Sequence, residues 1–179
     1  MKNQPKHILA ICGSSRSNSA NLLLIKAIEK ICGGDFKFHI SDTLLQLPFY
    51  NPDLDKEIFP EIVQKYKTEI INADGIFICS PEYVFSLPGV LKNGLEWLVS
   101  TTILSGKPAA LITASSAGES AHQQLILIMN TLGAKFDAKA TMLVSAVKTK
   151  INSEGIITDA NLLGKISILI NSFKRNIEN

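Results

Sequence analysis

The stretch Lys6-His-Ile-Leu-Ala-Ile-Cys12, followed directly by Gly13-Ser-Ser-Arg-Ser-Asn-Ser-Ala-Asn21, decides the fold. Its first part is a nearly continuous apolar run, as expected for a strand buried on both faces of a parallel sheet. After the polar second part, apolar residues recur at a three-to-four spacing, which predicts a helix ending near Gly33 and Gly34. These apolar residues are Leu24, Ile25, Ile28 and Ile31. The chain therefore opens with a strand, a polar loop and a helix.

The same alternation continues along the chain. Further apolar runs predict strands at residues 36–40, 75–79, 108–114 and 138–144. Helical spacing covers Ile58, Ile62, Tyr66 and Ile70, and returns at residues 88–99 and 121–132. Residues 42–55, which contain two prolines, are expected to form an irregular connection.

A closing helix is predicted from Asp159 to Phe173, with Asp159 as its N-cap. Its apolar face is expected to carry Ala160, Leu163, Ile166 (or Ser167) and Ile170. Strands and helices then alternate over the whole chain. This pattern implies a parallel sheet with right-handed crossovers and helices on both faces. Five strands favour the strand order 2-1-3-4-5 of the flavodoxin-like, doubly wound α/β fold.

The composition fits one globular domain covering residues 1–179, because 46% of residues are apolar and 19% are charged. The formal charge of +2, without a long basic run, argues against nucleic acid as a partner. The polar start of the chain and the short apolar run after it argue against a signal peptide or a membrane span. These features predict a cytoplasmic protein.

The cysteines are Cys12, Cys32 and Cys79, and no two of them form a C-x-x-C pair. Their odd number argues against a disulfide framework, and their spacing suggests no metal site. We interpret them as small buried apolar residues.

Ligands of an open parallel sheet bind outside the carboxyl ends of its strands, near the point where the strand order reverses. In this chain, that rule selects the loops after the first, third and fourth strands. They are residues 13–21, 80–89 and 115–120, and they are the most distinctive segments of the sequence.

The first loop is rich in hydroxyl groups and contains Arg16, and it comes just before a helix N-terminus. Free backbone N–H groups and the helix dipole favour an anion there, and a guanidinium adds charge and bidentate geometry. The loop lacks the glycine patterns of dinucleotide and nucleoside-triphosphate sites, which favours a monophosphate. The simpler alternative is that Ser17, Asn18 or Ser19 only caps the helix.

The second loop places Tyr83 and Phe85 near Pro81 and Pro88, which suggests a rigid apolar wall against which a planar ring could lie. The alternative is that the prolines only shape a turn, with the aromatic side chains packing beneath it or against another subunit. The third loop is small and polar, so it could approach a ligand closely or simply form a turn.

At these loops the chain resembles the NADPH-dependent FMN reductase family, a flavodoxin-like group that includes quinone, azo-dye and chromate reductases. The family's phosphate motif, G-S-x-R-x-x-S-x-N, is matched by Gly13, Ser14, Arg16, Ser19 and Asn21. Its ring motif, P-E-Y-N followed by P-G-x-L-K-N, is similar to residues 81–84 and 88–93, with Val84 in place of Asn. The third loop is only loosely similar.

The resemblance implies an enzyme that passes a hydride from NADPH or NADH through FMN to a quinone, a flavin or another small acceptor. The flavin does the chemistry, so no catalytic protein residue is expected. Backbone N–H groups of the second or third loop would face the negative charge that develops on the reduced ring. The expected FMN-binding residues are Ser14, Arg16, Ser19, Asn21, Pro81, Glu82, Tyr83, Val84, Ser115 and Gly118.

The resemblance also implies a homodimer or homotetramer with the flavin near a subunit boundary. Tyr83, Phe85, Leu87 and Trp97 could supply apolar contacts there, although Trp97 is as readily a core residue of its own helix. His122, near the third loop, could donate a proton, but a single histidine at a helix start is more often structural.

Other functional classes fit the sequence less well. A flavodoxin-type electron carrier would show a T-x-T-G-x-T loop and an acidic surface. A tyrosine phosphatase would need five residues between its cysteine and arginine, whereas three separate Cys12 from Arg16. A serine hydrolase would show a G-x-S-x-G turn. A flavin-binding protein with little turnover remains an alternative, because Val84 replaces the family's Asn.

Overall fold

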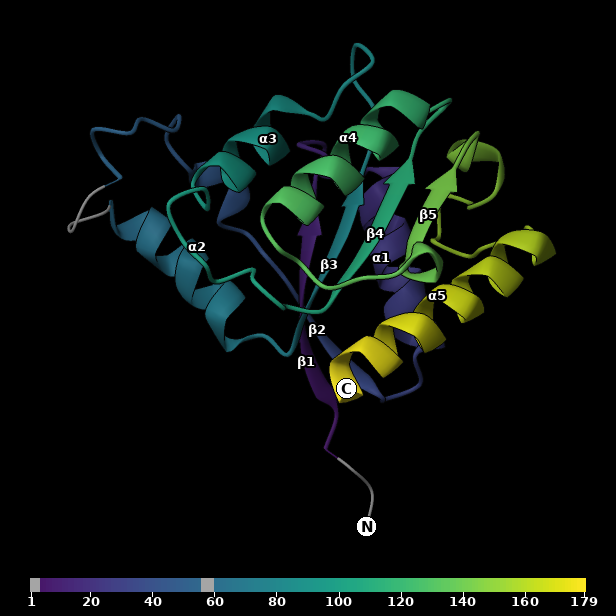
Figure 1. Ribbon diagram of the computed structural model, residues 1–179. Helices are drawn as coiled ribbons and strands as arrows, with labels where there is room; N and C mark the ends of the chain where they lie inside the picture. The colour runs from purple at the N-terminus through teal and green to yellow at the C-terminus, as the bar shows by residue number, and fades with distance from the viewer. Residues whose placement is uncertain (1–3, 56–59) are drawn as a thin grey trace.

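The computed structural model describes residues 4–55 and 60–179, which form a parallel sheet with helices on both faces (Figure 1). The strand order is β2-β1-β3-β4-β5, and every neighbouring pair is parallel, so the predicted flavodoxin-like order is confirmed. The strands are β1 (Lys6–Cys12), β2 (Phe36–Ile40), β3 (Gly75–Ser80), β4 (Ala109–Ala114) and β5 (Thr141–Val144).

The strands are joined by helices, with short 3₁₀ turns at three of the connections. The helices are α1 (Ala20–Ile31), α2 (Glu61–Asn72), α3 (Gly89–Glu96), α4 (Glu119–Thr131) and α5 (Ala160–Glu178). The 3₁₀ turns are η1 (Leu44–Gln46), η2 (Ala138–Ala140) and η3 (Val147–Thr149). Within the described parts of the chain, no helix is both long enough and apolar enough to cross a membrane.

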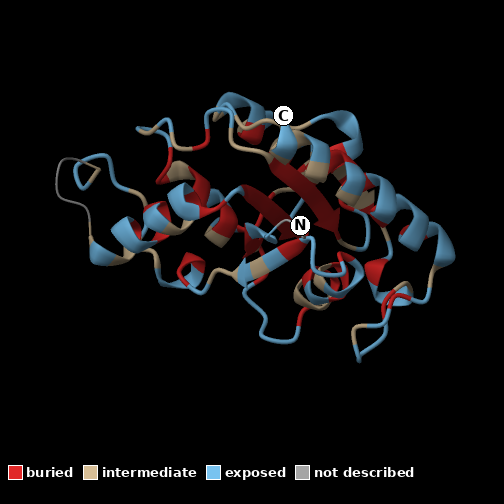
Figure 2. Cartoon of the chain, turned by 90° about the horizontal axis from the view of Figure 1, so that it is seen from below, coloured by how far each residue is buried: buried red, intermediate tan, exposed pale blue. Residues whose placement is uncertain are grey.

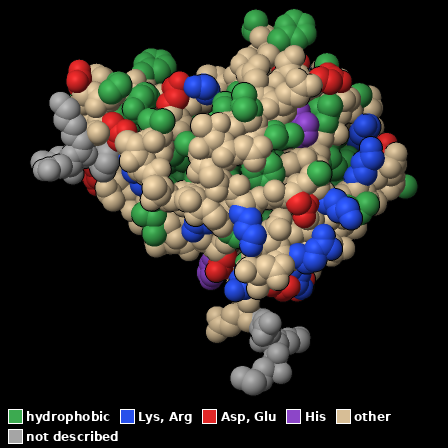
Figure 3. Space-filling model, in the orientation of Figure 1, with side chains coloured by type: hydrophobic (Ala, Val, Ile, Leu, Met, Phe, Trp, Pro, Cys, Tyr) green, Lys and Arg blue, Asp and Glu red, His purple; other side chains and the backbone are tan. Residues whose placement is uncertain are grey.

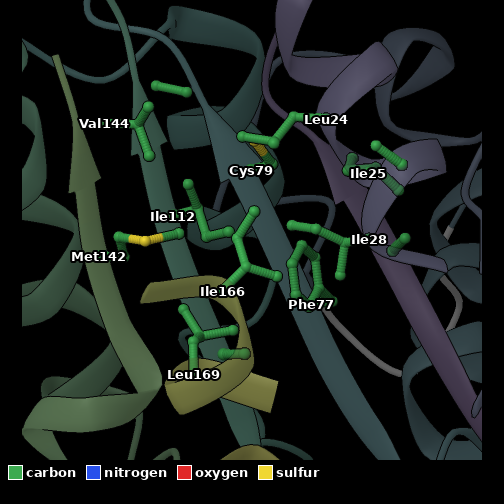
Figure 4. Packing of buried hydrophobic residues seen from close by; sticks show 14 of the residues in the cluster. Leu24, Ile25, Ile28, Phe77, Cys79, Ile112, Met142, Val144, Ile166 and Leu169 are labelled. Atoms are coloured by element: carbon green, nitrogen blue, oxygen red, sulfur yellow. The ribbon is translucent and has the colours of Figure 1, made fainter. Parts of the chain in front are cut away.

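Alternate residues of β1, β3 and β4 enter two separate cores, because successive side chains of a strand point to opposite faces, whereas the edge strands β2 and β5 contribute to one core only. Leu24 and Ile28 of α1 and Ile166 of α5 pack on one face, over Phe77 and neighbouring strand residues (Figure 4). Helices α2, α3 and α4 cover the other face. Figure 2 shows central strands buried between helices whose outer sides are exposed, and β3 and β4 are buried along their whole length. The sheet is thus a rigid base for the loops at its carboxyl edge.

Several predicted boundaries shift. The fifth strand starts at Thr141 and not at residue 138, because the Asp137 carboxylate accepts hydrogen bonds from the N–H groups of Lys139 and Ala140 and holds residues 138–140 in a 3₁₀ turn. The helix predicted at residues 88–99 ends at Glu96. The helix predicted from Ile58 begins at Glu61, and Ile58 itself lies outside the described residues.

The face of α5 also differs from the prediction. Asp159 is the N-cap, as expected, and its carboxylate accepts from the N–H of Leu162 at 2.7 Å. Ala160 and Leu163 nevertheless face solvent. The buried stripe consists of Leu162, Ile166, Leu169 and Phe173. Both stripes have helical spacing and share Ile166, and the stripe with the larger side chains packs on the sheet because it buries more apolar surface.

Trp97 is a core residue and not a surface contact. Its side chain is fully buried, and its Nε1–H donates to the Pro48 carbonyl at 2.8 Å. Leu87 is buried as well. Of the aromatic and apolar residues considered for a subunit boundary, Tyr83 and Phe85 remain exposed.

The cysteines are free thiols, and Cys32 and Cys79 are buried as expected. Burial raises the pKa of Cys32 to about 12, with Asp35 and Glu29 adding to the effect. Burial also raises the pKa of Cys79 well above its usual value. Both thiols therefore stay protonated and behave as small apolar side chains.

Candidate functional site

A pocket of about 410 Å³ opens at the carboxyl ends of the strands, where the strand order reverses. Its volume lies within the range of small-molecule and cofactor sites. It is lined by Ser14, Arg16, Ser19, Ala20, Asn21, Pro81, Glu82, Tyr83, Ala114, Ser115, Ser116, Ala146, Val147, Lys148 and Thr149. All the residues predicted for the site are on its wall except Val84 and Gly118.

The first loop and the start of α1 contribute hydrogen-bond donors to this pocket. Ser19 is the N-cap, and its Oγ accepts from the N–H of Leu22 at 3.1 Å. Among the described residues, nothing accepts from the N–H groups of Ala20 and Asn21, and nothing pairs with the exposed guanidinium of Arg16. These donors converge where the helix dipole already favours negative charge. Capping by Ser19 and anion binding are thus compatible.

Asn21 has a structural task as well as a place on the pocket wall. Its side chain is buried, its Nδ2 donates to the Ala114 carbonyl at 3.2 Å, and its Oδ1 accepts from Cys79 Sγ at 3.2 Å. The amide thus ties α1 to the ends of β3 and β4, and one Nδ2 hydrogen is left for a ligand.

Gly13 is required by a close approach between the first two loops. A Cβ at this position would lie 2.8 Å from Cβ of Ser80, a distance that non-bonded carbon atoms do not adopt. The absence of a side chain therefore lets the first loop leave β1 directly beside the end of β3.

The second loop contains a tight hairpin turn at residues 83–86. Tyr83 and Ser86 exchange two backbone hydrogen bonds of 3.0 and 3.1 Å. Between them, Val84 and Phe85 have φ values of +53° and +56°, which belong to the left-handed region and are costly for a β-branched or bulky residue. Val84 is 94% exposed and Phe85 77% exposed. Figure 3 shows hydrophobic side chains projecting at the top of the molecule, where Figure 1 draws the loop between β3 and α3.

The hairpin is fastened to α4 by side chains. Ser86 Oγ donates to Gln124 Oε1 at 2.8 Å, and Gln124 Nε2 donates to the Phe85 carbonyl at 3.1 Å. Glu82 Oε2 accepts from the N–H of Ala121 at 2.9 Å, in the first turn of the same helix. Glu82 is therefore engaged in capping α4, and Gln124 is a supporting residue that the sequence analysis did not identify.

The third loop is joined to the segment that follows β5. The N–H of Ala146 donates to the Ser116 carbonyl at 3.1 Å, and the N–H of Val147 donates to the Ser115 carbonyl at 3.2 Å. The sequence analysis missed this wall, because it applied the carboxyl-end rule to the first, third and fourth strands only. The one feature of the sequence that could have indicated this wall is Lys148, a basic residue shortly after the last strand.

Two further residues of this region do not line the pocket. Gly118 has a φ of +116° and precedes α4, and a Cβ there would lie 2.8 Å from Cδ1 of Leu143, so it shapes the turn. The Nδ1 atom of His122 lies 3.1 Å from Thr113 Oγ1. Burial lowers the pKa of His122, so its imidazole is neutral at pH 7. The structural interpretation of His122 fits these contacts better than the interpretation as a proton donor.

The donors present fit a flat ring that carries a phosphate monoester. Hydroxyls, free N–H groups and a guanidinium line the pocket near the start of α1, and Pro81 and Tyr83 add apolar surface to the same lining. Glu82 and Ser116 also line the pocket, and their backbone N–H groups, for which the described residues provide no acceptor, could hydrogen-bond to the polar edge of a ring.

Comparisons with known proteins agree with this geometry. A family model described as NADPH-dependent FMN reductase matches residues 7–148. A 2-hydroxy-1,4-benzoquinone reductase from Burkholderia sp is 40% identical over 111 residues, which span 60% of this chain and 60% of that protein. A quinone reductase from Escherichia coli (strain K12) is 27% identical over 96% of this chain and 95% of its own length. Among solved structures, the flavoenzyme NAD(P)H:(acceptor) oxidoreductase FerB from Paracoccus denitrificans covers 97% of both chains with a TM-score of 0.77 and 26% identity.

Proposed function

This chain belongs to the NADPH-dependent FMN reductase family, and on that premise we propose that it is an FMN-dependent NAD(P)H oxidoreductase that reduces a quinone, a flavin or another small acceptor. The observation that carries the proposal is one pocket that joins an anion site at the start of α1 to an apolar wall at residues 81–83. FMN, when bound, supplies a ring that accepts a hydride from a reduced nicotinamide and passes reducing equivalents on.

The phosphate is assigned to the first loop. We propose that the Arg16 guanidinium, the hydroxyls of Ser14 and Ser19, and the N–H groups of Ala20 and Asn21 hold it. Arg16 contributes the full charge, whereas the helix start contributes oriented dipoles. Ser19 keeps its capping bond to Leu22 and can still donate its hydroxyl hydrogen to a phosphate oxygen.

The ring is assigned to the space between the second and third loops. Pro81 and Tyr83 provide the flat apolar surface, and Ser115 of the third loop also lines the pocket. Glu82 acts indirectly, since its carboxylate caps α4 and thereby fixes the loop. Val84 and Gly118 shape the loops and lie outside the pocket lining. The residues position the ring and exclude water, and no protein base takes part in the hydride step.

We also propose that the protein is a homodimer or homotetramer in the cytoplasm. Exposed apolar side chains at Tyr83, Val84 and Phe85 support a subunit contact beside the pocket, since such groups are seldom clustered on the surface of a monomer. The free thiols of the cysteines support a reducing compartment.

The test is an anaerobic titration of the FMN-loaded protein with NADPH, with NADH in parallel, followed by the visible absorbance of the flavin. Rapid bleaching, with colour returning when benzoquinone is added, is the expected result. Bound flavin that stays oxidised would support an electron carrier or a flavin-binding protein with little turnover. Failure to bind FMN would overturn the proposal.

A further inference from the structure

We infer that Lys148 is a second cation for the phosphate monoester of FMN, in addition to Arg16 of the family motif. The inference rests on the proposed function, because it concerns the same pocket. Lys148 belongs to η3, which follows β5, and its side chain lies on the pocket wall. Neither the phosphate motif nor the three loops selected by the sequence includes this segment.

The backbone around Lys148 is held firmly at the rim of the pocket. Val147 is buried, and its N–H donates to the Ser115 carbonyl at 3.2 Å. Ala146 turns the chain with a φ of +51°, and its N–H donates to the Ser116 carbonyl at 3.1 Å. Lys148 therefore extends its exposed side chain from a fixed point beside the third loop.

The face of the sheet on which the Lys148 segment packs indicates whether Lys148 lies near the phosphate or near the ring of FMN. Val147 packs into the core formed with α1 and α5, on the face of the sheet that carries the phosphate-binding helix start. The hairpin at residues 83–86 is fastened to α4, which covers the opposite face. Lys148 thus follows directly on a residue that packs on the phosphate side of the sheet, and among the described residues no hydrogen bond links residues 147–149 to the hairpin at residues 83–86.

The charges of the pocket lead to the same assignment. A phosphate monoester carries a charge of about −1.5 to −2 at pH 7, so one guanidinium leaves it incompletely balanced. The charged residues of the lining are Arg16, Glu82 and Lys148. The Glu82 carboxylate is already directed to the start of α4. Lys148 forms no ion pair with any residue in the ranges 4–55 and 60–179, so its ammonium is available for the second negative charge.

A phosphate monoester could also come from the 2′-phosphate of NADPH, and the experiment separates the two sources. Dissociation constants of FMN and of riboflavin, which lacks the phosphate, are measured by flavin fluorescence for the wild-type protein and for Lys148→Gln and Lys148→Arg. The matched control is Lys150→Gln, which removes the same charge from the same segment but not from the pocket lining.

We expect Lys148→Gln to weaken FMN binding about tenfold, as for the loss of one charge-assisted contact, with riboflavin unchanged. Lys148→Arg should keep the FMN affinity, and Lys150→Gln should match the wild type. Any of three results for Lys148→Gln would overturn the inference. The variant could lose affinity for FMN and riboflavin equally, or lose no more FMN affinity than Lys150→Gln does. It could also change only the preference for NADPH over NADH. If the wild-type protein binds FMN normally in those cases, the proposed function stands; if it binds no FMN, both fail.

Discussion

The first and second loops both line one pocket, but they are held in place by different physical means. The first loop is held by a helix cap and a buried amide, and it leaves N–H groups and the Arg16 guanidinium free. The second loop holds Val84 and Phe85 in a costly backbone conformation, which hydrogen bonds to Gln124 keep in place. The first loop therefore has unpaired donors that can bind a ligand. The second loop has a strained backbone that hydrogen bonds to α4 stabilise.

If this contrast is correct, removing Arg16 should affect binding and not folding. We expect Arg16→Ala to weaken FMN binding about a hundredfold, the upper range for one ionic hydrogen-bonding group. The thermal unfolding midpoint of the flavin-free protein should not change, because the Arg16 side chain is exposed and has no partner among the described residues. Fluorescence titration and calorimetry measure the two quantities, and an unchanged FMN affinity would contradict the assignment of the first loop.

The second wall should respond in the opposite way. Gln124→Ala removes both side-chain bonds to the hairpin, so the free energy of unfolding should fall by about 1–2 kcal/mol. FMN and riboflavin should lose affinity equally, because the ring wall is disturbed and the phosphate site is not. Gln123→Ala, at the exposed neighbouring position, is the control. A loss confined to FMN would show that the two walls are not independent.

Backbone strain at Val84 can be tested directly. Val84→Asn should raise the free energy of unfolding by about 1 kcal/mol, since Asn adopts the left-handed region more easily than a β-branched residue. Little apolar burial is lost, because Val84 is 94% exposed. Val99→Asn, at a 60% exposed position, is the matched control. Urea unfolding of the flavin-free variants gives the comparison, and equal effects at both positions would argue against strain.

The smallest effect concerns pH and the start of α4. Burial lowers the pKa of His122, whereas an unfolded histidine titrates at about 6.5. Below that pH the unfolded chain therefore binds more protons than the folded one, and stability falls as the pH decreases. His122→Gln should reduce this slope below about pH 6.5. Chemical unfolding at several pH values measures it, and parallel curves for the two proteins would refute the effect.

The sequence predicted the sheet well, because buried parallel strands are read as apolar runs such as residues 6–12. It failed at residues 138–140, where the side-chain bonds of Asp137 override an apolar pattern. For α5 it predicted Ile166 and Ile170 on the core side correctly but also placed Ala160 and Leu163 there, since Leu162 and Leu163 both fit helical spacing and only packing on the sheet separates them.

For the site, the first loop could be selected from the sequence, because its hydroxyl groups and its guanidinium lie within one continuous segment. The contribution of residues 146–149 could not be predicted, because backbone hydrogen bonds to Ser115 and Ser116 bring this segment to the pocket and no local sequence pattern indicates such bonds. The tight turn at Val84 and Phe85 was equally hidden, since such turns normally show Gly or Asn. Gln124 bonds to Ser86 and Phe85, which are 38 and 39 residues away along the chain, so no sequence motif could indicate its role.

The amide of Asn21 has a consequence for how the protein is supplied with its cofactor. It joins α1 to the ends of β3 and β4 through bonds that lie wholly within the chain, so the frame of the pocket needs no ligand to form. We expect the flavin-free chain to fold completely before it binds FMN. Bound FMN should then add stability only by mass action. The fraction of molecules that carry FMN would then follow the free FMN concentration and the dissociation constant of the pocket.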